Sequence, residues 1–369
     1  MRAELSERDL DDLARGAAFL GTGGGGDPYI GRLLVDWALA RGQQLELLSL
    51  EELEDSAFVI CTAGMGAPTV VVEKLPRGDE AAVALRALEA HVGRKADATM
   101  PIECGGINSM VPLVVGVLLG IPIVDADGMG RAFPELQMET FNVYGASATP
   151  MAIVDERDST AIVTTGDAKS AEWLARGLTI RMGGHAMIAE YPMDGETAKR
   201  VSIPGTISLG IRVGRAIREA REAHRDPFEA LAETLADTIY RHGRVIFAGK
   251  VVDVLRRTTE GFAKGHARIE GADGAVLEIV FQNEHLVAQV DGEVRGIVPD
   301  LICVLEAETA EPITTEAIRY GQRVKVMVVS TPEIMRTPEA LEVFGPRAFG
   351  LAQEFRPIEE LASEEAGTR

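Results

Sequence analysis

The 369-residue sequence has few cysteines, few aromatic side chains and no excess of positive charge. Its three cysteines, Cys61, Cys104 and Cys303, are an odd number without CxxC spacing, which fits neither a disulfide framework nor a cysteine-based zinc knuckle. This usage indicates a reducing compartment, so we expect a cytoplasmic protein. No run reaches the ~18 apolar residues of a membrane span, and the N-terminus has acidic residues where a secretory signal has basic and apolar ones.

The 37 lysines and arginines are outnumbered by 57 aspartates and glutamates, which gives a formal net charge of −20. Nucleic acids and anionic membranes are bound by a concentrated Lys/Arg face, and the sequence contains no such run, so we expect neither partner. Hydrophobic residues make up 46% of the chain, so a core can form and the acidity lies on a folded surface. At about 100–200 residues per domain, the length predicts about two domains.

Short apolar runs that end in glycine or acidic residues alternate with helical stretches along the first part of the chain. This rhythm predicts an α/β domain with a mostly parallel sheet over residues 1–165, continued by a helical segment over 166–242. From Gly243 the runs become β-rich, which predicts a mainly antiparallel β domain over 243–330. We expect the last segment, 331–369, to pack back on the body. The predicted elements are strands at 45–48, 57–61, 99–103 and 121–124, helices at 6–19, 30–41, 79–93, 108–119 and 168–178, a hairpin at 151–166 and two helices within 207–242.

The loop GTGGGGDP contains four consecutive glycines before a predicted helix. Gly23, Gly24 and Gly25 could therefore offer backbone N–H groups to a small anionic or amide substrate. A P-loop has Lys-Ser/Thr after its glycines, whereas Asp27-Pro28 stands here, and a dinucleotide fingerprint follows a strand, whereas the preceding residues look helical. We expect no nucleotide; the alternative to a substrate loop is a tight packed turn.

The sequence ECGGINS places Glu103 at the end of a predicted strand. Glu103 is a candidate acid/base or metal ligand, and Asn108 could orient a substrate carbonyl. The alternative is that Asn108 caps the next helix and Glu103 is solvated. Cys104 has no sequence-local base to activate it, and a buried thiol is commoner than a nucleophile.

Asp125 and Asp127 are two apart in an extended segment, so we expect them to point to the same side and to share a cation or a proton. Carboxylate oxygens suit Mg, Ca or Mn, whereas zinc normally recruits histidine as well. Arg131 could then hold a substrate carboxylate bidentately. The alternative is an Asx-type turn, in which one aspartate bonds its own backbone.

His185 lies between two glycines and an apolar run, so we expect it to be partly buried. It is either a general base or metal ligand, or a core histidine with satisfied hydrogen bonds. No HxH or HExxH spacing occurs, so a metal site would have to be assembled across the fold. In the β-rich part, FQNEHLVA over 281–288 is either a solvated strand edge or a segment that leans a carboxylate or amide into the cleft.

Several motifs together resemble the bacterial family known as domain of unknown function 917, now associated with S-methyl thiohydantoin desulfurase. The resemblance covers nearly the whole chain and implies an N-terminal α/β domain and a C-terminal β-rich domain. It also implies hydrolysis of a small-molecule substrate, an S-methyl thiohydantoin, at the sulfur-bearing ring carbon, with release of methanethiol to leave a hydantoin. The matching motifs are GTGGGGDPYIGR, MGAPTVVVEKLP, ECGGINS, IPIVDADGMGRAFPELQM, FQNEH, VPDLI and GPRAFG.

The resemblance assigns roles as expectations. A general base, with or without a divalent metal such as zinc, takes the water proton, while the glycine loop with Asn108 or Arg131 holds the ring. His185 protonates the leaving group or ligates the metal. A hydantoin or oxoproline amidohydrolase, and a non-catalytic partner of a hydantoinase, are the alternatives; a homo-oligomer and association with a hydantoinase stay open. The candidate catalytic residues are Glu103, Asp125, Asp127 and His185, and the candidate metal ligands are Asp125, Asp127 and His185.

Overall fold

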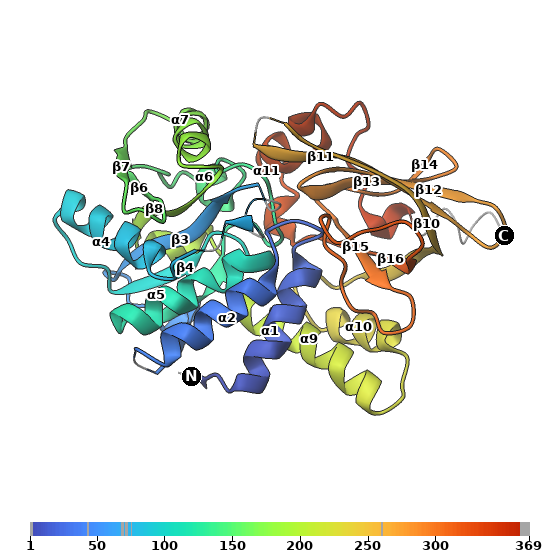
Figure 1. Ribbon diagram of the computed structural model, residues 1–369, viewed down its shortest axis with the longest axis horizontal. Coiled ribbons are helices and arrows are strands. Elements are labelled where there is room, and N and C mark those ends of the chain that lie inside the picture. Colours follow the sequence, from blue (N-terminus) through green and yellow to red (C-terminus); the bar gives the residue numbers. More distant parts are fainter. Residues whose placement is uncertain are drawn as a thin grey trace.

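The computed structural model describes residues 3–361 except for 43, 68, 69, 71, 72, 75 and 260. Two β-sheets form the two sides of the molecule, and helices lie against the first sheet (Figure 1). The last residues of the predicted tail, 362–369, and parts of the MGAPTVVVEKLP motif lie outside the described residues. Among the residues that are described, no helix is long and apolar enough to cross a membrane.

The first sheet has nine strands with a parallel centre. They are β1 (Ala3–Glu4), β2 (Glu46–Ser49), β3 (Phe58–Gly66), β4 (Ala98–Pro101), β5 (Ile123–Asp127), β6 (Met151–Val154), β7 (Thr160–Val163), β8 (His185–Asp194) and β9 (Ile203–Pro204). The order is β1-β2-β5-β4-β3-β8-β6-β7, with β9 paired to β5. Strands β2, β5, β4 and β3 run parallel, and antiparallel strands extend both ends. The α/β prediction is confirmed.

The second sheet has seven strands, and every neighbouring pair is antiparallel, which confirms the β-rich prediction. Its order is β14-β13-β12-β11-β10-β16-β15. Strands β12 and β13 are joined by Asn283 alone, whose φ of 58° makes the turn. The strands are β10 (Gly243–Thr259), β11 (Phe262–Glu270), β12 (Val276–Gln282), β13 (Glu284–Val290), β14 (Glu293–Ile297), β15 (Leu301–Glu306) and β16 (Arg323–Val329).

Helices pack on both faces of the first sheet. Figure 1 shows α2 and α5 on one side of it and α7 on the other, with α9 and α10 below the second sheet. The α-helices are α1 (Glu7–Leu20), α2 (Pro28–Leu39), α4 (Glu80–Val92), α5 (Val111–Leu119), α6 (Thr140–Val143), α7 (Ala168–Arg181), α8 (Gly195–Val201), α9 (Thr206–Glu222), α10 (Pro227–Ala236) and α11 (Pro338–Phe344). Short 3-10 turns are η1 (Leu50–Glu52), η2 (Gly106–Ser109), η3 (Glu333–Met335) and η4 (Pro346–Phe349).

Helix starts follow local side-chain chemistry, which is why the sequence predicts them well. Ser6 caps α1 by accepting from the Asp9 N–H at 3.2 Å, and Asp9 accepts from the Ser6 N–H at 3.0 Å in return. Asp226 caps α10 by accepting from the Phe228 N–H at 2.7 Å, with Pro227 at the first helical position. Both helices begin within a residue of the predicted start.

The predicted helical segment 166–242 contains a strand that the prediction lacked. Strand β8 pairs antiparallel with β3 and β6. Its side chains from His185 to Tyr191 are all buried, so the segment shows no alternation that would separate a strand from a buried helix. Because His185 pairs with Gly66 at the end of β3, this strand carries the histidine to the edge where the parallel strands end.

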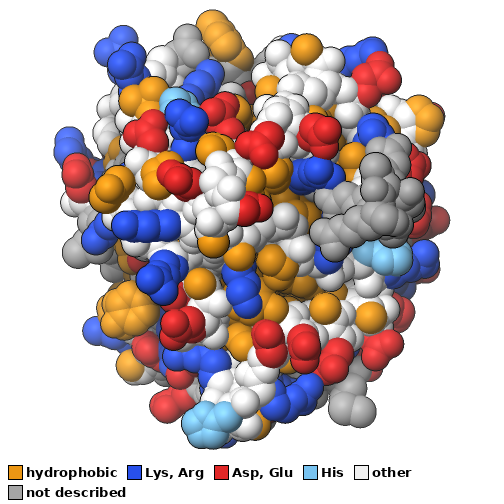
Figure 2. Space-filling model, turned by 90° about the vertical axis from the view of Figure 1, so that its right-hand side faces the viewer, with side chains coloured by type: hydrophobic (Ala, Val, Ile, Leu, Met, Phe, Trp, Pro, Cys, Tyr) orange, Lys and Arg blue, Asp and Glu red, His pale blue; other side chains and the backbone are white. Residues whose placement is uncertain are grey.

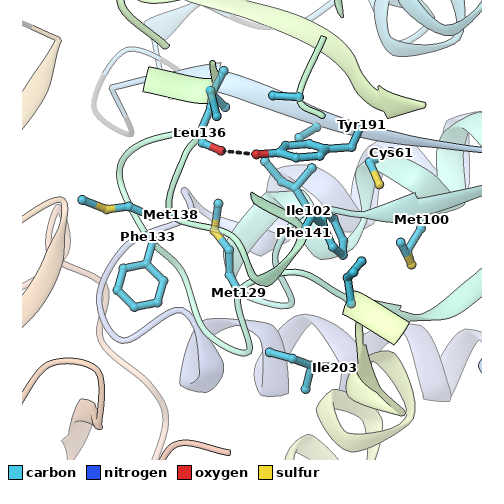
Figure 3. Packing of buried hydrophobic residues seen from close by; sticks show 14 of the residues in the cluster. Cys61, Met100, Ile102, Met129, Phe133, Leu136, Met138, Phe141, Tyr191 and Ile203 are labelled. Atoms are coloured by element: carbon cyan, nitrogen blue, oxygen red, sulfur yellow. Dashed lines mark hydrogen bonds between the residues drawn. The ribbon is translucent and has the colours of Figure 1, made fainter. Parts of the chain in front are cut away.

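The long loop after β5 is held on the sheet by a core rich in methionine and aromatic side chains. Figure 3 shows Met129 and Phe141 of this segment on the side of Tyr191 of β8, while the ring of Phe133 lies farther from Tyr191. The rings of Phe141 and Tyr191 meet edge to face at 5.3 Å, and the Tyr191 hydroxyl donates to the Leu136 carbonyl at 3.0 Å. The loop is therefore a fixed part of the structure.

The described part of the C-terminal segment contacts both sides of the molecule. Met335 and Phe344 join the core that includes the β5 loop, and Ile358 joins the core of the second sheet.

Figure 2 shows the surface on the side of the second sheet. Lys/Arg and Asp/Glu side chains are interspersed there around apolar ones.

Helices α1 and α9 pack closely against each other where glycines face one another. A Cβ at Gly16 would lie 1.8 Å from the Gly210 carbonyl oxygen, so the helices would have to separate. We expect Gly16→Ala to lower the free energy of unfolding by about 1–3 kcal/mol, measured by urea denaturation.

Gly177 of α7 provides the matched control, because a Cβ there meets nothing within 4 Å. We expect Gly177→Ala to raise stability by up to about 1 kcal/mol through helix propensity. If both substitutions change the free energy of unfolding by the same amount, the close packing of α1 on α9 is not the reason that glycine is needed at position 16.

Candidate active site

A pocket of about 50 Å³ lies where the carboxyl ends of the parallel strands meet the tip of the β12–β13 hairpin. In open parallel sheets, this is the edge where ligands bind. A few water molecules fit in such a volume. The pocket brings together four of the predicted site residues, Glu103, Asn108, His185 and Gly25. It adds others that were not among them, chiefly Asn283, Glu284 and Arg176.

Glu103 follows β4 and is almost completely buried. Its Oε1 accepts from the Asn108 side-chain amide at 2.5 Å, and its Oε2 accepts from the Phe133 N–H at 3.2 Å. Asn108 also accepts from the Gly64 N–H at 2.7 Å, so its amide links β3 to Glu103. The expected helix cap at Asn108 is not formed, and the residue positions Glu103 instead.

Glu284 reaches the same pocket from the second sheet, at the tip of the β12–β13 hairpin. It is 2% exposed, and its Oε2 has no hydrogen-bond partner among the described residues. Burial raises the pKa of Glu284 to about 8, although the Arg131 guanidinium opposes the rise. Burial, with the charge of Glu284 adding to it, likewise raises the pKa of Glu103 well above its usual range.

Two buried carboxyls in one pocket share protons rather than ionise together. Both Glu103 oxygens accept N–H groups, which favours the charged form, whereas Glu284 Oε2 accepts none. When the pair holds one proton, this difference favours the charge on Glu103 and the proton on Glu284, against the burial that raises the pKa of Glu103 as well. This arrangement can supply a general base and a general acid at neutral pH.

His185 contributes a neutral imidazole. Its Nε2 packs close to Gly64, where an added Cβ would come within 2.8 Å of it. Burial, with the charge of Lys74 adding to it, lowers the pKa of His185 to about 4. Within the described part of the chain its ring makes no hydrogen bond. An imidazolium that protonates a leaving group, as expected from the sequence, does not fit this pKa.

The glycine loop lies between the two sheets. Gly25 lines the pocket, whereas Gly23 and Gly24 lie behind it and are not in the lining. A Cβ at Gly24 would lie 1.9 Å from Glu284 Oε1, so glycine lets the loop fit beneath this carboxyl. The Gly23 carbonyl accepts from the Thr315 N–H at 2.7 Å. The expectation that Gly23 and Gly24 bind substrate is corrected: they are packed against the second domain.

Arg131 does not hold a substrate, because its guanidinium is fully buried and its donors are used within the protein. A guanidinium has five N–H groups. Here they meet five oxygens: the Ala132 carbonyl at 3.1 Å, those of Pro299 and Asp300 at 3.3 and 2.8 Å, the Thr22 hydroxyl at 2.7 Å and the His285 carbonyl at 2.9 Å. Arg131 therefore joins the glycine loop to the second domain, which corrects its predicted role.

Asp125 and Asp127 are also outside the pocket lining, and their carboxylates bond different partners. Asp125 accepts from the Ile207 and Ser208 N–H groups at the start of α9. Asp127 Oδ2 accepts from three backbone N–H groups, those of Cys104 at 2.9 Å, Met129 at 3.1 Å and Gly130 at 2.8 Å. The shared cation or proton expected of this pair is not supported, because each carboxylate is bound by backbone N–H groups. Only the bonds of Asp127 to Met129 and Gly130 match the Asx-turn alternative.

The donor set does not suit a metal ion. Across the described residues, no group of three or more His, Cys, Asp or Glu side chains is placed to hold one. His185 lies in the pocket, whereas Asp125 and Asp127 lie outside its lining, and backbone N–H groups bind Asp125 and the Oδ2 atom of Asp127.

The missed residue with the greatest consequence is Glu284. The FQNEH segment could be identified as a candidate because of its polar residues within a β-rich run, but the choice between a solvated edge and a cleft residue depends on long-range packing. Asn283 Oδ1 accepts from the Ala263 N–H at 2.8 Å, which fixes the hairpin tip at the pocket.

The fold and the pocket define the class of protein. It has an α/β domain and an antiparallel β domain, and the pocket that they share contains two buried carboxyls suited to acid/base chemistry. The chain belongs to the S-Me-THD-like family, since residues 8–165 match its N-terminal domain and residues 166–358 its C-terminal domain. The resemblance noted in the sequence is thereby confirmed.

One solved structure shares the fold over nearly its whole length. A protein from Chromobacterium violaceum, known from a crystal structure, is 22% identical, with a TM-score of 0.79 over 96% of this chain and 100% of that chain. A search of curated proteins gave no significant match. The boundary between the two family regions falls before α7, yet β8 beyond it pairs with β3, so both regions build the first sheet.

Beside the pocket region, Glu139 and Glu190 form a second pair of buried acids. Both are fully buried, and none of their carboxyl oxygens has a hydrogen-bond partner within the part of the chain that the structure describes. Burial, together with each other's proximity, raises the pKa of Glu139 well above its usual range. The folded protein therefore keeps this pair protonated.

This pair makes the stability depend on pH. A raised carboxyl pKa in the fold gives stability that is present below the ordinary value and lost as pH rises through the folded value. We expect Glu139→Gln, which cannot ionise, to be about 1–3 kcal/mol more stable than wild type at pH 9 and nearly equal at pH 5. Urea denaturation at both pH values measures this. Glu278 is exposed, so Glu278→Gln is the control and should have the same unfolding free energy as wild type at both pH values. If Glu139→Gln also has the unfolding free energy of wild type at pH 9, the account is contradicted.

Proposed function

We propose that the protein is a hydrolase that converts an S-methyl thiohydantoin to a hydantoin and methanethiol. The observation that carries this proposal is that Glu103 and Glu284, from two domains, line one small pocket. Membership of the S-Me-THD-like family supports the choice of substrate.

The reaction needs a base and an acid at one carbon. Glu103 takes a proton from water as the water oxygen bonds to the ring carbon that carries sulfur, and the carbon–nitrogen double bond shifts its electrons to nitrogen. Glu284 donates its proton to sulfur as the carbon–sulfur bond breaks and methanethiol leaves. The remaining hydroxyl proton moves to the ring nitrogen, which gives the hydantoin carbonyl. One proton then passes from Glu103 to Glu284 and resets the pair.

The other pocket groups orient the reactants. Asn108 is a positioning residue, because its amide holds Glu103 and bonds both backbone groups of Gly64. The neutral imidazole of His185 can donate to a ring carbonyl or accept from a ring N–H. Low-dielectric surroundings strengthen these interactions. Arg131 acts indirectly, since it holds the loop and hairpin that deliver Glu284.

The direct test replaces each carboxyl by an amide of the same shape. We expect Glu103→Gln and Glu284→Gln each to lower kcat for S-methyl thiohydantoin by about 100-fold or more, because general acid or base catalysis contributes about 10²–10⁴-fold. Release of methanethiol, trapped with a thiol reagent, is the measurement. Circular dichroism checks that the variants remain folded.

Glu278→Gln is the matched control, since Glu278 is exposed on β12, the strand that leads to Glu284, and should keep full activity. Plain hydantoins assayed in parallel test the amidohydrolase alternative. Full activity of both pocket variants, or ring opening of hydantoin faster than methanethiol release, would contradict the proposal.

A further inference from the structure

A large apolar groove of about 890 Å³ adjoins the small pocket. It lies between α7, the edge strand β7 and Phe262 at the start of β11. Several of its apolar side chains are exposed: Trp173 at 76%, Ile180 at 49% and Leu174 at 42%. Contiguous exposed apolar side chains of this kind mark ligand or partner sites, whereas single ones do not.

The groove and the pocket are adjacent. Glu135 and Arg176 line both, so the two spaces meet at these residues. The pocket itself, at about 50 Å³, cannot enclose a ring together with a large substituent. A substituent on a bound ring must therefore project outward, and the groove is the adjoining space that can receive it.

The boundary between pocket and groove does not favour an anionic substituent. Arg176 donates to Glu172 at 2.7 Å and to the Pro134 carbonyl at 2.8 Å, and its guanidinium stacks on Phe262 at 4.5 Å. Its charge is thus neutralised by Glu172, and its flat face is covered by the ring. Beyond it the walls are mainly apolar, with Trp173, Leu178 and Ile162, and Lys169 is the other cation in the lining.

We propose that this groove binds the ring substituent of the substrate, and that the substituent is a large apolar one such as a benzyl or a branched alkyl group. The assignment rests on the proposed function for the identity of the ring. Thiohydantoins and hydantoins derived from amino acids carry the amino-acid side chain on a ring carbon. The preferred substrates are accordingly derived from aromatic or large aliphatic amino acids, with Trp173 as the main specificity residue.

Binding of product-type rings tests the groove without relying on turnover. Dissociation constants are measured by calorimetry for unsubstituted hydantoin and for 5-benzylhydantoin. We expect the benzyl compound to bind about 10- to 100-fold more tightly, the gain from burying one aromatic group. Trp173→Ala should reduce this ratio to within about 3-fold of unity. Tyr320→Ala is the matched control, because Tyr320 is 73% exposed on the other domain, and the ratio should stay as in wild type.

Each other outcome has a defined meaning. Equal affinity for the two hydantoins, no binding of either, or an unchanged ratio in Trp173→Ala would overturn the groove assignment. If sedimentation shows a dimer that Trp173→Ala dissociates while the ratio is unchanged, the groove is an interface between copies and the assignment is likewise wrong. If the ratio behaves as expected but no S-methyl thiohydantoin releases methanethiol, the proposed function fails and the groove assignment stands.

Discussion

The buried guanidinium of Arg131 is the interaction on which the arrangement of the site depends. It lies between the loop that follows β5, the glycine loop and the second domain, and its N–H groups bond oxygens of all three. Burial lowers the pKa of Arg131 to about 10, so the charge is retained at neutral pH. Removing one partner from such a buried charge is costly, which keeps the two domains in one relative position.

That fixed position explains the paired carboxyls. Glu103 belongs to the first sheet and Glu284 to a hairpin tip of the second, so neither domain alone contains the pair. The glycine loop passes between them, and Gly24 leaves the space that Glu284 occupies. Packing against apolar surroundings then raises both carboxyl pKa values. An acid and a base of the same residue type can thus coexist in one pocket, as differing environments assign them different roles.

The sequence allowed the parts of the fold that depend on local chemistry to be predicted. Ser6 and Asp226 cap helices with their own neighbours, and the apolar runs of the parallel strands are short and bounded by turns. Strand β8 was missed because burial on both faces removes its alternation. Within the site, Glu103 was predicted because it follows a strand, and His185 because it lies between two glycines and an apolar run. Arg131 was misassigned and Glu284 not selected, because full burial and domain contact arise from residues far apart in the chain.

The central claim is that Glu103 and Glu284 share one proton at neutral pH. Carbon-13 NMR titration of protein labelled at the glutamate side-chain carboxyl carbon tests it most directly, with Glu284→Gln and Glu103→Gln to assign the signals. The account predicts a resonance that titrates near the Glu284 pKa of about 8, is absent in Glu284→Gln, and moves to a lower pKa in Glu103→Gln, which removes the neighbouring charge. A Glu284 signal that titrates at the ordinary carboxyl pKa of about 4.3, unaffected by Glu103→Gln, would contradict it.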